Sequence, residues 1–147
     1  MKTVVFASTE DCLRSSIAAT FFDAFSLPTV RALSVSNRSE RTPPEVIYAM
    51  EEVGLHAPDQ PELVRAGVLE GATLIVLFGD FRTPPTVPTQ RWDVPLPGGR
   101  EIEHVRVIRD ALRRRVWRLV AQHGWYRLQP AKAVATRRGE AAEHAPA

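Results

Sequence analysis

The segment from Val4 to Ser16 constrains the fold more than any other part of the chain. It begins with an apolar run rich in β-branched and aromatic side chains, which is typical of a buried parallel strand. A short polar loop follows, and then a helix with an apolar face made of Ile17, Ala18, Phe21, Phe22 and Phe25. A strand that leads through a loop into a helix brings backbone N–H groups and a helix N-terminus together. The segment therefore predicts an anion-binding loop.

The rest of the chain repeats this alternation of strands and helices. Residues 72–79 are mostly apolar, as a central parallel strand requires. Thr42 and Glu45 have the spacing of a capping box, and Gly54 is placed to end the helix that the box opens. The other elements that we expect are strands over 29–35 and 89–94 and helices over about 61–68 and 101–123. Alternating elements of this kind predict a doubly wound α/β sandwich with right-handed crossovers.

Length and composition fit a single domain. The chain has 147 residues, of which 44% are hydrophobic and 24% charged, as in ordinary soluble proteins. We expect a domain over 1–128 and a polar, flexible tail over 129–147. Because no apolar stretch is long enough for a bilayer and Met1 leads directly into a strand, we expect a cytoplasmic protein without membrane contact. A single cysteine, Cys12, excludes an internal disulfide and a Cys-only metal site, and we expect no metal and no cofactor.

Arginine is unusually frequent in the expected helix over 101–123. All but two of the 19 basic residues of the chain are arginines, although the formal net charge is only +2. Those of this helix fall on the side opposite its apolar positions. Because no nucleic-acid-binding motif accompanies them, a solvated helix face is favoured over a nucleic-acid site, and we expect no nucleic-acid partner.

The loop between the first strand and the first helix resembles a known phosphate loop. The low-molecular-weight protein tyrosine phosphatases, and the arsenate reductases that share their fold, have there a catalytic Cys, five further residues and an Arg-Ser pair. Arg14 and Ser15 match that pair, and Ser8 stands where the family has its Cys. The resemblance implies a three-layer α/β sandwich with a four-stranded parallel sheet, in the order 2-1-3-4, flanked by helices. It also implies that Ser8, Thr9, Arg14 and Ser15 are the candidate residues for binding phosphate or sulfate.

The residues that perform the family's chemistry are altered in this chain. A serine hydroxyl, unlike a thiol, needs an adjacent general base, and no histidine is near Ser8 in sequence. The family's Gly-Asn pair is replaced by Glu10 and Asp11, whose charges oppose anion binding unless they point outward. Leu96 stands at the general-acid position, while Asp93, three residues earlier, is expected to be an exposed loop residue. The sequence therefore predicts no catalytic residues.

Two residues of the loop leave alternatives open. Arg14 either holds an oxyanion with its guanidinium or pairs with Glu10 or Asp11 and closes the site. Cys12 is either activated by the helix N-terminus or packed and inert, and the inert state is favoured. An arsenate-reducing thiol relay is not expected, because residues 80–85 contain none of the further cysteines that it needs.

These observations lead to three hypotheses for the function. The first is a catalytically degenerate, non-catalytic member of the family that acts in binding or regulation. The second is an active phosphatase for phosphate monoesters with an unusual nucleophile, and the third is an oxyanion-binding module. A laboratory Cys-to-Ser substitution would look the same at Ser8, but the other departures favour natural loss. Trp92 and the surrounding proline-rich loop are expected either to contact a protein partner or second copy, or to pack into the sheet edge.

Overall fold

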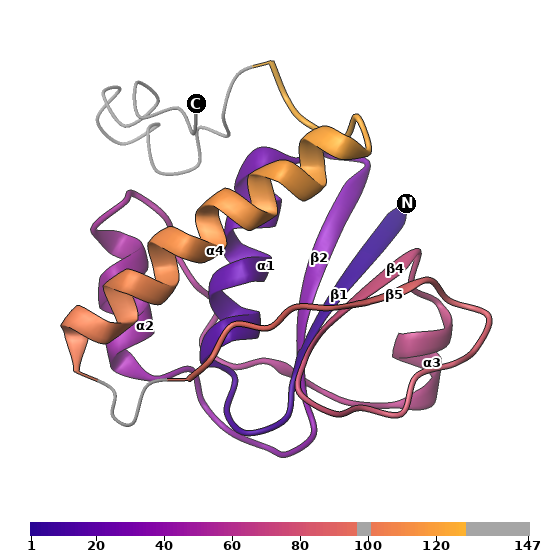
Figure 1. Cartoon of the computed structure of the whole chain (residues 1–147), viewed down its shortest axis with the longest axis horizontal. Helices are drawn as coiled ribbons and strands as arrows, with labels where there is room; N and C mark the ends of the chain where they lie inside the picture. The colour runs from indigo at the N-terminus through magenta and orange to yellow at the C-terminus, as the bar shows by residue number, and fades with distance from the viewer. Residues whose placement is uncertain (97–100, 129–147) are drawn as a thin grey trace.

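The computed structural model describes residues 1–96 and 101–128, and its strands and helices alternate along the chain as far as β4, which is followed by a further strand, β5 (Figure 1). The elements are β1 (Lys2–Ser8), α1 (Leu13–Phe25), β2 (Val30–Ser36), α2 (Pro44–Glu51), β3 (Glu62–Leu63), α3 (Ala66–Glu70), β4 (Leu74–Phe78), β5 (Thr89–Arg91) and α4 (Ile102–Gln122). The tail that we expected over 129–147 lies outside the described residues.

The strands form one parallel sheet in the order β3-β2-β1-β4-β5, with β1 at its centre. Along its length β1 pairs with β2, from Lys2 opposite Val30 to Ser8 opposite Ser36. The predicted order 2-1-3-4 is confirmed in the strands β2, β1, β4 and β5. The difference is β3, which adds a fifth strand of two residues at the edge beyond β2.

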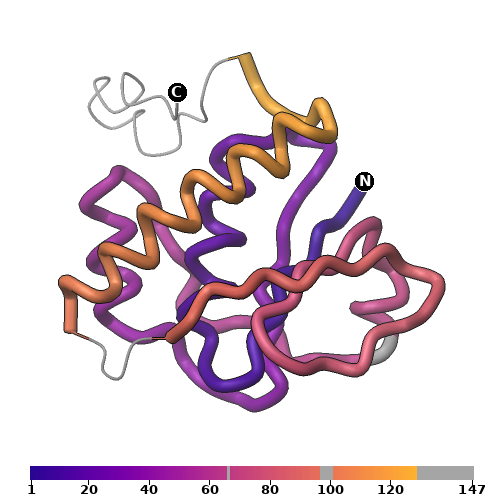
Figure 2. The backbone as a smooth tube through the Cα atoms, viewed as in Figure 1, coloured from indigo at the N-terminus to yellow at the C-terminus, as the bar shows by residue number. Residues whose placement is uncertain are grey.

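Helices cover both faces of the sheet, as the three-layer prediction requires. Alternate residues of β1 enter two separate apolar clusters. Val4 and Phe6 pack in the larger cluster with α1, α2 and α4, while Val5 and Ala7 pack on the opposite face with Leu69 of α3. This alternation is the two-residue period of a strand buried on both faces. Figure 2 shows the connections between the layers, including the long segment that passes from β4 through β5 toward α4.

Two predictions for the region between β2 and β4 are wrong. The helix expected over 61–68 is replaced by β3 and then by α3, because Val64 donates its N–H to the Ser36 carbonyl and continues the sheet edge instead. The capping box is also absent. The Thr42 hydroxyl donates to the Pro58 carbonyl at 2.7 Å, so it fixes the connector after α2, and no side-chain cap is present at the start of α2.

The segment after β4 is the part of the fold that reaches the candidate site. The expected strand over 89–94 is shorter, because pairing stops at Arg91. Trp92 still donates its backbone N–H to the Leu77 carbonyl at 2.9 Å, and then the chain leaves the sheet and crosses above the start of α1. In the described parts of the chain, no helix has both the length and the apolar character to cross a bilayer, and no three potential metal ligands gather.

Candidate functional site

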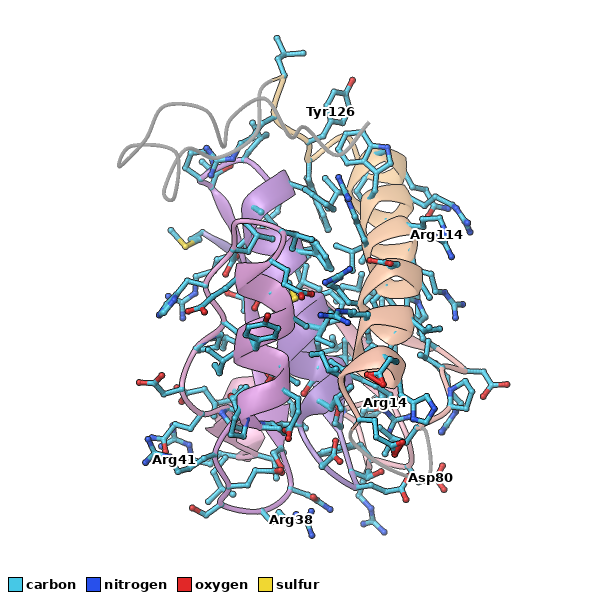
Figure 3. The ribbon with its side chains drawn as sticks, turned by 90° about the vertical axis from the view of Figure 1, so that its left-hand side faces the viewer. Arg14, Arg38, Arg41, Asp80, Arg114 and Tyr126 are labelled. Atoms are coloured by element: carbon cyan, nitrogen blue, oxygen red, sulfur yellow. The ribbon has the colours of Figure 1, made fainter. Side chains whose placement is uncertain are left out.

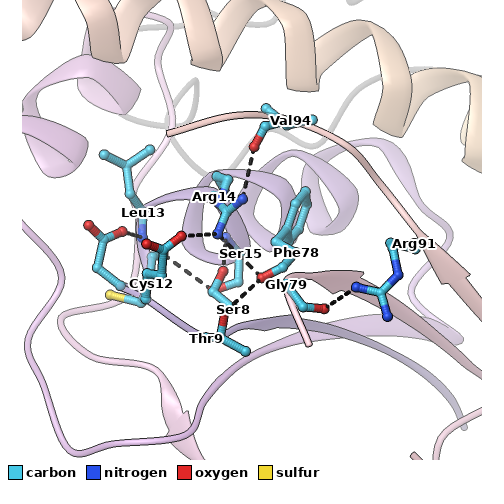
Figure 4. A network of polar contacts seen from close by, with 12 residues as sticks. Ser8, Thr9, Cys12, Leu13, Arg14, Ser15, Phe78, Gly79, Arg91 and Val94 are labelled. Atoms are coloured by element: carbon cyan, nitrogen blue, oxygen red, sulfur yellow. Dashed lines mark hydrogen bonds and ion pairs between the residues drawn. The ribbon is translucent and has the colours of Figure 1, made fainter. Parts of the chain in front are cut away.

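The candidate loop joins the end of the central strand β1 to the start of α1 (Figure 4). Ser8 is fully buried, and its Oγ accepts the backbone N–H of Ser15 at 3.1 Å. Thr9 is held against the end of β4, because its N–H and its Oγ1 both donate to the Phe78 carbonyl, at 3.3 Å and 3.5 Å. Gly79 makes this contact feasible: its φ is +113°, and a Cβ there would lie 2.0 Å from Thr9 Oγ1. The loop is therefore fixed at both ends.

Ser15 is engaged in a buried group of hydroxyls. Its Oγ donates to the Cys12 carbonyl at 3.3 Å and accepts the Ser34 hydroxyl at 2.9 Å. Ser34 in turn lies 3.4 Å from Ser16 Oγ. The Ser15 hydroxyl thus joins α1 to β2, while only its backbone N–H contacts Ser8. Within residues 1–96 and 101–128, Ser8 Oγ has no hydrogen bond to a histidine or a carboxylate, so no general base contacts its hydroxyl in the described structure.

Arg14 is buried, with 6% of its surface exposed, although it carries a charge. Its Nη1 donates to the Val94 carbonyl at 2.8 Å and its Nη2 to the Phe78 carbonyl at 3.3 Å, and the guanidinium lies 5.5 Å from the Phe78 ring centre. The Glu10 carboxylate approaches Nη2 only to 4.0 Å and its side chain is 75% exposed. Burial lowers the pKa of Arg14, and the nearby Glu10 opposes this shift. Arg14 therefore holds the loops after β4 and β5 in place.

One nitrogen of this guanidinium has no partner. Arg14 Nε is buried and makes no hydrogen bond within the described residues. An unsatisfied buried donor on a charged group is unusual, because it costs free energy that a hydrogen bond would recover. Arg14 was expected either to bind an oxyanion or to pair with an acidic residue of the loop. Its contact with Glu10 is at the outer limit of an ion pair, and its guanidinium retains one donor without an acceptor.

Glu40, in the loop after β2, is a residue of the site that no sequence pattern indicated. Its Oε1 accepts the backbone N–H of Cys12 at 3.2 Å, at the residue that precedes α1. Its Oε2 accepts the Ser36 hydroxyl, and Arg38 Nε lies 3.7 Å from the same oxygen. Only 13% of the Glu40 side chain is exposed. A carboxylate of the protein itself thus occupies a backbone donor of the candidate anion-binding loop.

Asp11 also turns toward the helix. Its Oδ1 accepts the backbone N–H of Leu13 at 2.9 Å, which satisfies one of the free donors of the first helical turn. Glu10 points outward, as its exposure indicates. Together with the Cys12 N–H on Glu40 and the Thr9 N–H on Phe78, three donors between residues 9 and 13 are engaged within the protein.

Cys12 is packed rather than reactive. It is fully buried, and its Sγ lies 3.8 Å from the Arg41 carbonyl, to which it donates. Burial raises the pKa of its thiol to about 11, and the Glu40 carboxylate contributes in the same direction. A thiol with a raised pKa is a poor nucleophile near neutral pH. This supports the inert alternative.

The segment after β5 contains Trp92, Asp93 and Leu96, the other residues that the sequence singled out. Leu96 is half-buried against the larger apolar cluster, and Asp93 is exposed as expected. Trp92 is only 6% exposed and packs its ring edge to face with Phe6 and Phe78. Trp92 therefore packs at the sheet edge, which was the second of its two expected roles. A protein contact through the surrounding proline-rich loop stays a prediction.

Sequence reasoning could have found Glu40 only in part. Its loop follows β2 at the same sheet edge as Ser8, and ligands of parallel sheets lie at that edge. The loop also contains Asn37, Arg38, Ser39 and Arg41, and nothing in the sequence distinguishes the residue that turns inward. The local pattern therefore marks the loop but not the carboxylate.

Comparisons with known proteins identify the fold. No model of a known protein family matches the sequence, and no curated protein is significantly similar to it. An arsenate reductase from Archaeoglobus fulgidus is 25% identical over 80% of this chain and 98% of its own, with a TM-score of 0.70. An arsenate reductase in the phosphate binding state is 25% identical over 83% and 98%, with a TM-score of 0.68.

A phosphatase structure is similar over nearly the same region. It is a mutant of the YwlE arginine phosphatase with a phosphorylated active-site serine, 19% identical over 83% of this chain and 95% of its own, with a TM-score of 0.70. All three structures cover at least 80% of this chain with TM-scores of 0.68 to 0.70. The chain therefore has the fold of the arsenate reductases and of this phosphatase, as the resemblance of its first loop predicts.

Proposed function

We propose that this chain is a non-catalytic member of its fold family that acts in binding or regulation. Its former phosphate loop is held closed by carboxylates of the chain itself. The observation that carries this proposal is the contact between Glu40 and the Cys12 N–H, which places a negative charge at the start of α1. A helix N-terminus attracts an anion, and here a side chain already serves that purpose.

The residues at the reactive positions support the same conclusion. Ser8 has no general base within hydrogen-bond distance in the described structure, and its Oγ already accepts an N–H from Ser15. Leu96 has no proton to give to a leaving group. Arg14 donates hydrogen bonds from its two Nη atoms to the carbonyls of Val94 and Phe78. Nucleophile, acid and oxyanion donor are thus each altered or engaged.

A turnover assay with 4-nitrophenyl phosphate near neutral pH tests the proposal. We expect no hydrolysis above the rate without protein. The matched variants are Arg14→Lys, which alters the site, and Arg82→Lys, which changes an exposed arginine elsewhere. Hydrolysis that persists in Arg82→Lys and disappears in Arg14→Lys would contradict the proposal.

One observation favours a second candidate, an oxyanion-binding module. Arg14 Nε is buried without a partner, and a phosphate or sulfate oxygen is a suitable acceptor for it. The similar arsenate reductase in the phosphate binding state lends this candidate support. Ser8, Thr9, Arg14 and Ser15 are its candidate ligands. A rise in melting temperature with sulfate, without turnover, is the result that this candidate predicts.

An active phosphatase is the remaining candidate. The similar mutant phosphatase carries a phosphorylated active-site serine, and Ser8 stands at the nucleophile position of the motif. Incubation with 4-nitrophenyl phosphate followed by intact-mass measurement distinguishes this candidate. Addition of one phosphoryl group that is lost in Ser8→Ala would favour it over the non-catalytic function.

A further inference from the structure

The outer face of α4 carries a basic hollow that the candidate loop does not use. It has a volume of about 700 Å³ and runs along successive turns of α4 beside the end of α2. Arg109 and Asp110 line its part nearest the start of α4, and the rest of its lining is Val53, Arg113, Arg114, Trp117 and Arg118. Figure 3 shows Arg114 projecting from the outer side of this helix. We call the five residues of this remaining lining the α4 surface.

The arginines near the start of α4 are neutralised within the protein. Arg109 Nη1 lies 2.7 Å from a Glu52 carboxylate oxygen and its Nε lies 2.8 Å from Asp110 Oδ1. Arg106 binds the second oxygen of Glu52. These contacts fasten α4 to the end of α2 and leave little free charge at that end of the helix.

The following turns are different. Within residues 1–96 and 101–128, neither Arg114 nor Arg118 has a hydrogen-bond or ion-pair partner, and both side chains are exposed. Trp117 lies between them in sequence, half-buried, and edge contacts with Phe25 and Tyr126 fix its ring. The α4 surface thus combines the uncompensated guanidinium groups of Arg114 and Arg118 with the rigid ring of Trp117, and both residue types are enriched at binding hot spots.

We propose that the α4 surface binds an acidic peptide segment of a partner protein, in extended form, with carboxylates next to an apolar side chain. Arg114 and Arg118 are one helical turn apart, a rise of about 6 Å. Carboxylates at alternate positions of an extended peptide are separated by about 6.6 Å on the same side, which matches this spacing. Trp117 and Val53 provide the apolar contact for a flanking leucine where the peptide crosses the helix at an angle. Guanidinium groups bind carboxylates with two parallel hydrogen bonds, which fixes the register.

A peptide fits this surface better than a nucleic acid does. Two uncompensated arginines are a short footprint, whereas a nucleic-acid-binding domain needs an extended basic stripe. The apolar border made by Trp117 and Val53 offers nothing to a phosphate backbone but can cover a leucine side chain. The proposal concerns α4 and therefore stands apart from the activity of the Ser8 loop.

Calorimetric titration of the full chain with a synthetic peptide tests the proposal. The probe is acetyl-Leu-Ser-Glu-Ser-Glu-Ser-Leu-amide, which places two carboxylates and two leucines on one side of an extended strand. The comparison peptides replace both glutamates by glutamine, or both leucines by serine. We expect the probe to bind with a Kd of about 1 mM or lower. The affinity should fall at 0.5 M salt, because salt screens exposed charges. Both comparison peptides should bind more weakly.

Variants assign the binding to the surface. The double variant Arg114→Gln/Arg118→Gln should weaken binding at least about tenfold, whereas Arg41→Gln/Arg82→Gln, with the same change in charge at exposed positions elsewhere, should not. All four positions are exposed, so both proteins should fold, as circular dichroism checks. The proposal is overturned if the probe does not bind, if the glutamine peptide binds equally, or if both double variants behave alike. Tighter binding of a DNA duplex than of the probe at the same salt concentration would also overturn it.

Discussion

The Glu40 carboxylate accepts the backbone N–H of Cys12 at 3.2 Å and so joins the loop after β2 to the start of α1. This contact brings a negative side chain to a helix N-terminus, where an anion is stabilised. Asp11 adds a second carboxylate on the N–H of Leu13. Carboxylates of the protein itself thus occupy backbone donors of the loop that an external oxyanion would otherwise use.

The exchange Ser8→Cys alone should restore little turnover of an aryl phosphate. With a thiol at position 8, the carboxylates of Glu40 and Asp11 would still occupy the backbone N–H groups of Cys12 and Leu13. Leu96 would still be unable to protonate a leaving group. Adding Glu40→Gln to Ser8→Cys should raise the rate further, because it removes one opposing charge. Robust turnover in the single Ser8→Cys variant would show that the loop is intact and that the carboxylates do not block it.

Cys12 should react slowly with iodoacetamide in the folded protein. A pKa of about 11 leaves about one thiol in ten thousand ionised at pH 7. The rate of alkylation, followed by mass spectrometry, should therefore rise about tenfold per pH unit between 7 and 9. Glu40→Gln should speed the reaction at fixed pH, because the Glu40 carboxylate raises the pKa of this thiol. Rapid alkylation at pH 7, equal to that of the unfolded chain, would contradict the burial of Cys12.

Trp92→Ala should destabilise the fold by about 3–5 kcal/mol, the usual cost of removing a large buried aromatic side chain. The ring contacts Phe6 and Phe78, and its Nε1 donates to Gln90 Oε1 at 3.1 Å. Chemical denaturation measures the change, with Leu128→Ala as the control, because Leu128 is 95% exposed. A loss below about 1 kcal/mol would mean that Trp92 is not a core residue.

The fold could be predicted from sequence wherever one strong pattern dominated. β4 and α4 lie within about two residues of their expected bounds, because a buried strand and a long amphipathic helix have clear periods. Elements that depend on distant partners were missed. β3 forms because Glu62 and Leu63 pair with Val35 and Ser36 at the edge of the sheet. The Thr42 hydroxyl donates to the Pro58 carbonyl and does not cap α2. The contact of Glu40 was missed for the same reason, since its carboxylate accepts the N–H of Cys12, which lies 28 residues earlier in the chain.

Glu52→Gln should reduce stability near neutral pH but have less effect in acid. The Arg106 hydrogen bond, followed by that of Arg109, lowers the pKa of the Glu52 carboxyl from 4.5 to about 2. A lowered pKa in the folded state means that the stabilisation is present above about pH 4.5 and is lost as the pH falls toward 2. Denaturation at a series of pH values should show the difference from wild type shrinking over that window.

The neighbouring Glu51→Gln is the matched control for this pH series. Glu51 is exposed at the same end of α2. Its replacement should leave the pH dependence of stability close to that of wild type. A wild-type curve that remains parallel to that of Glu52→Gln from neutral pH down to pH 2 would show that the contacts of Glu52 with α4 contribute no charge-dependent stability.

Calorimetric titration with sulfate at pH 7 tests most directly whether Glu40 closes the loop. The wild-type chain should bind sulfate weakly or not at all, and Glu40→Ala should bind at least about tenfold more tightly, because a carboxylate near the anion is removed. Glu40→Gln provides a second variant that keeps the size of the side chain, and Glu51→Ala, at an exposed position of α2, is the control. Sulfate binding by wild type that equals that of Glu40→Ala and Glu40→Gln would contradict the account.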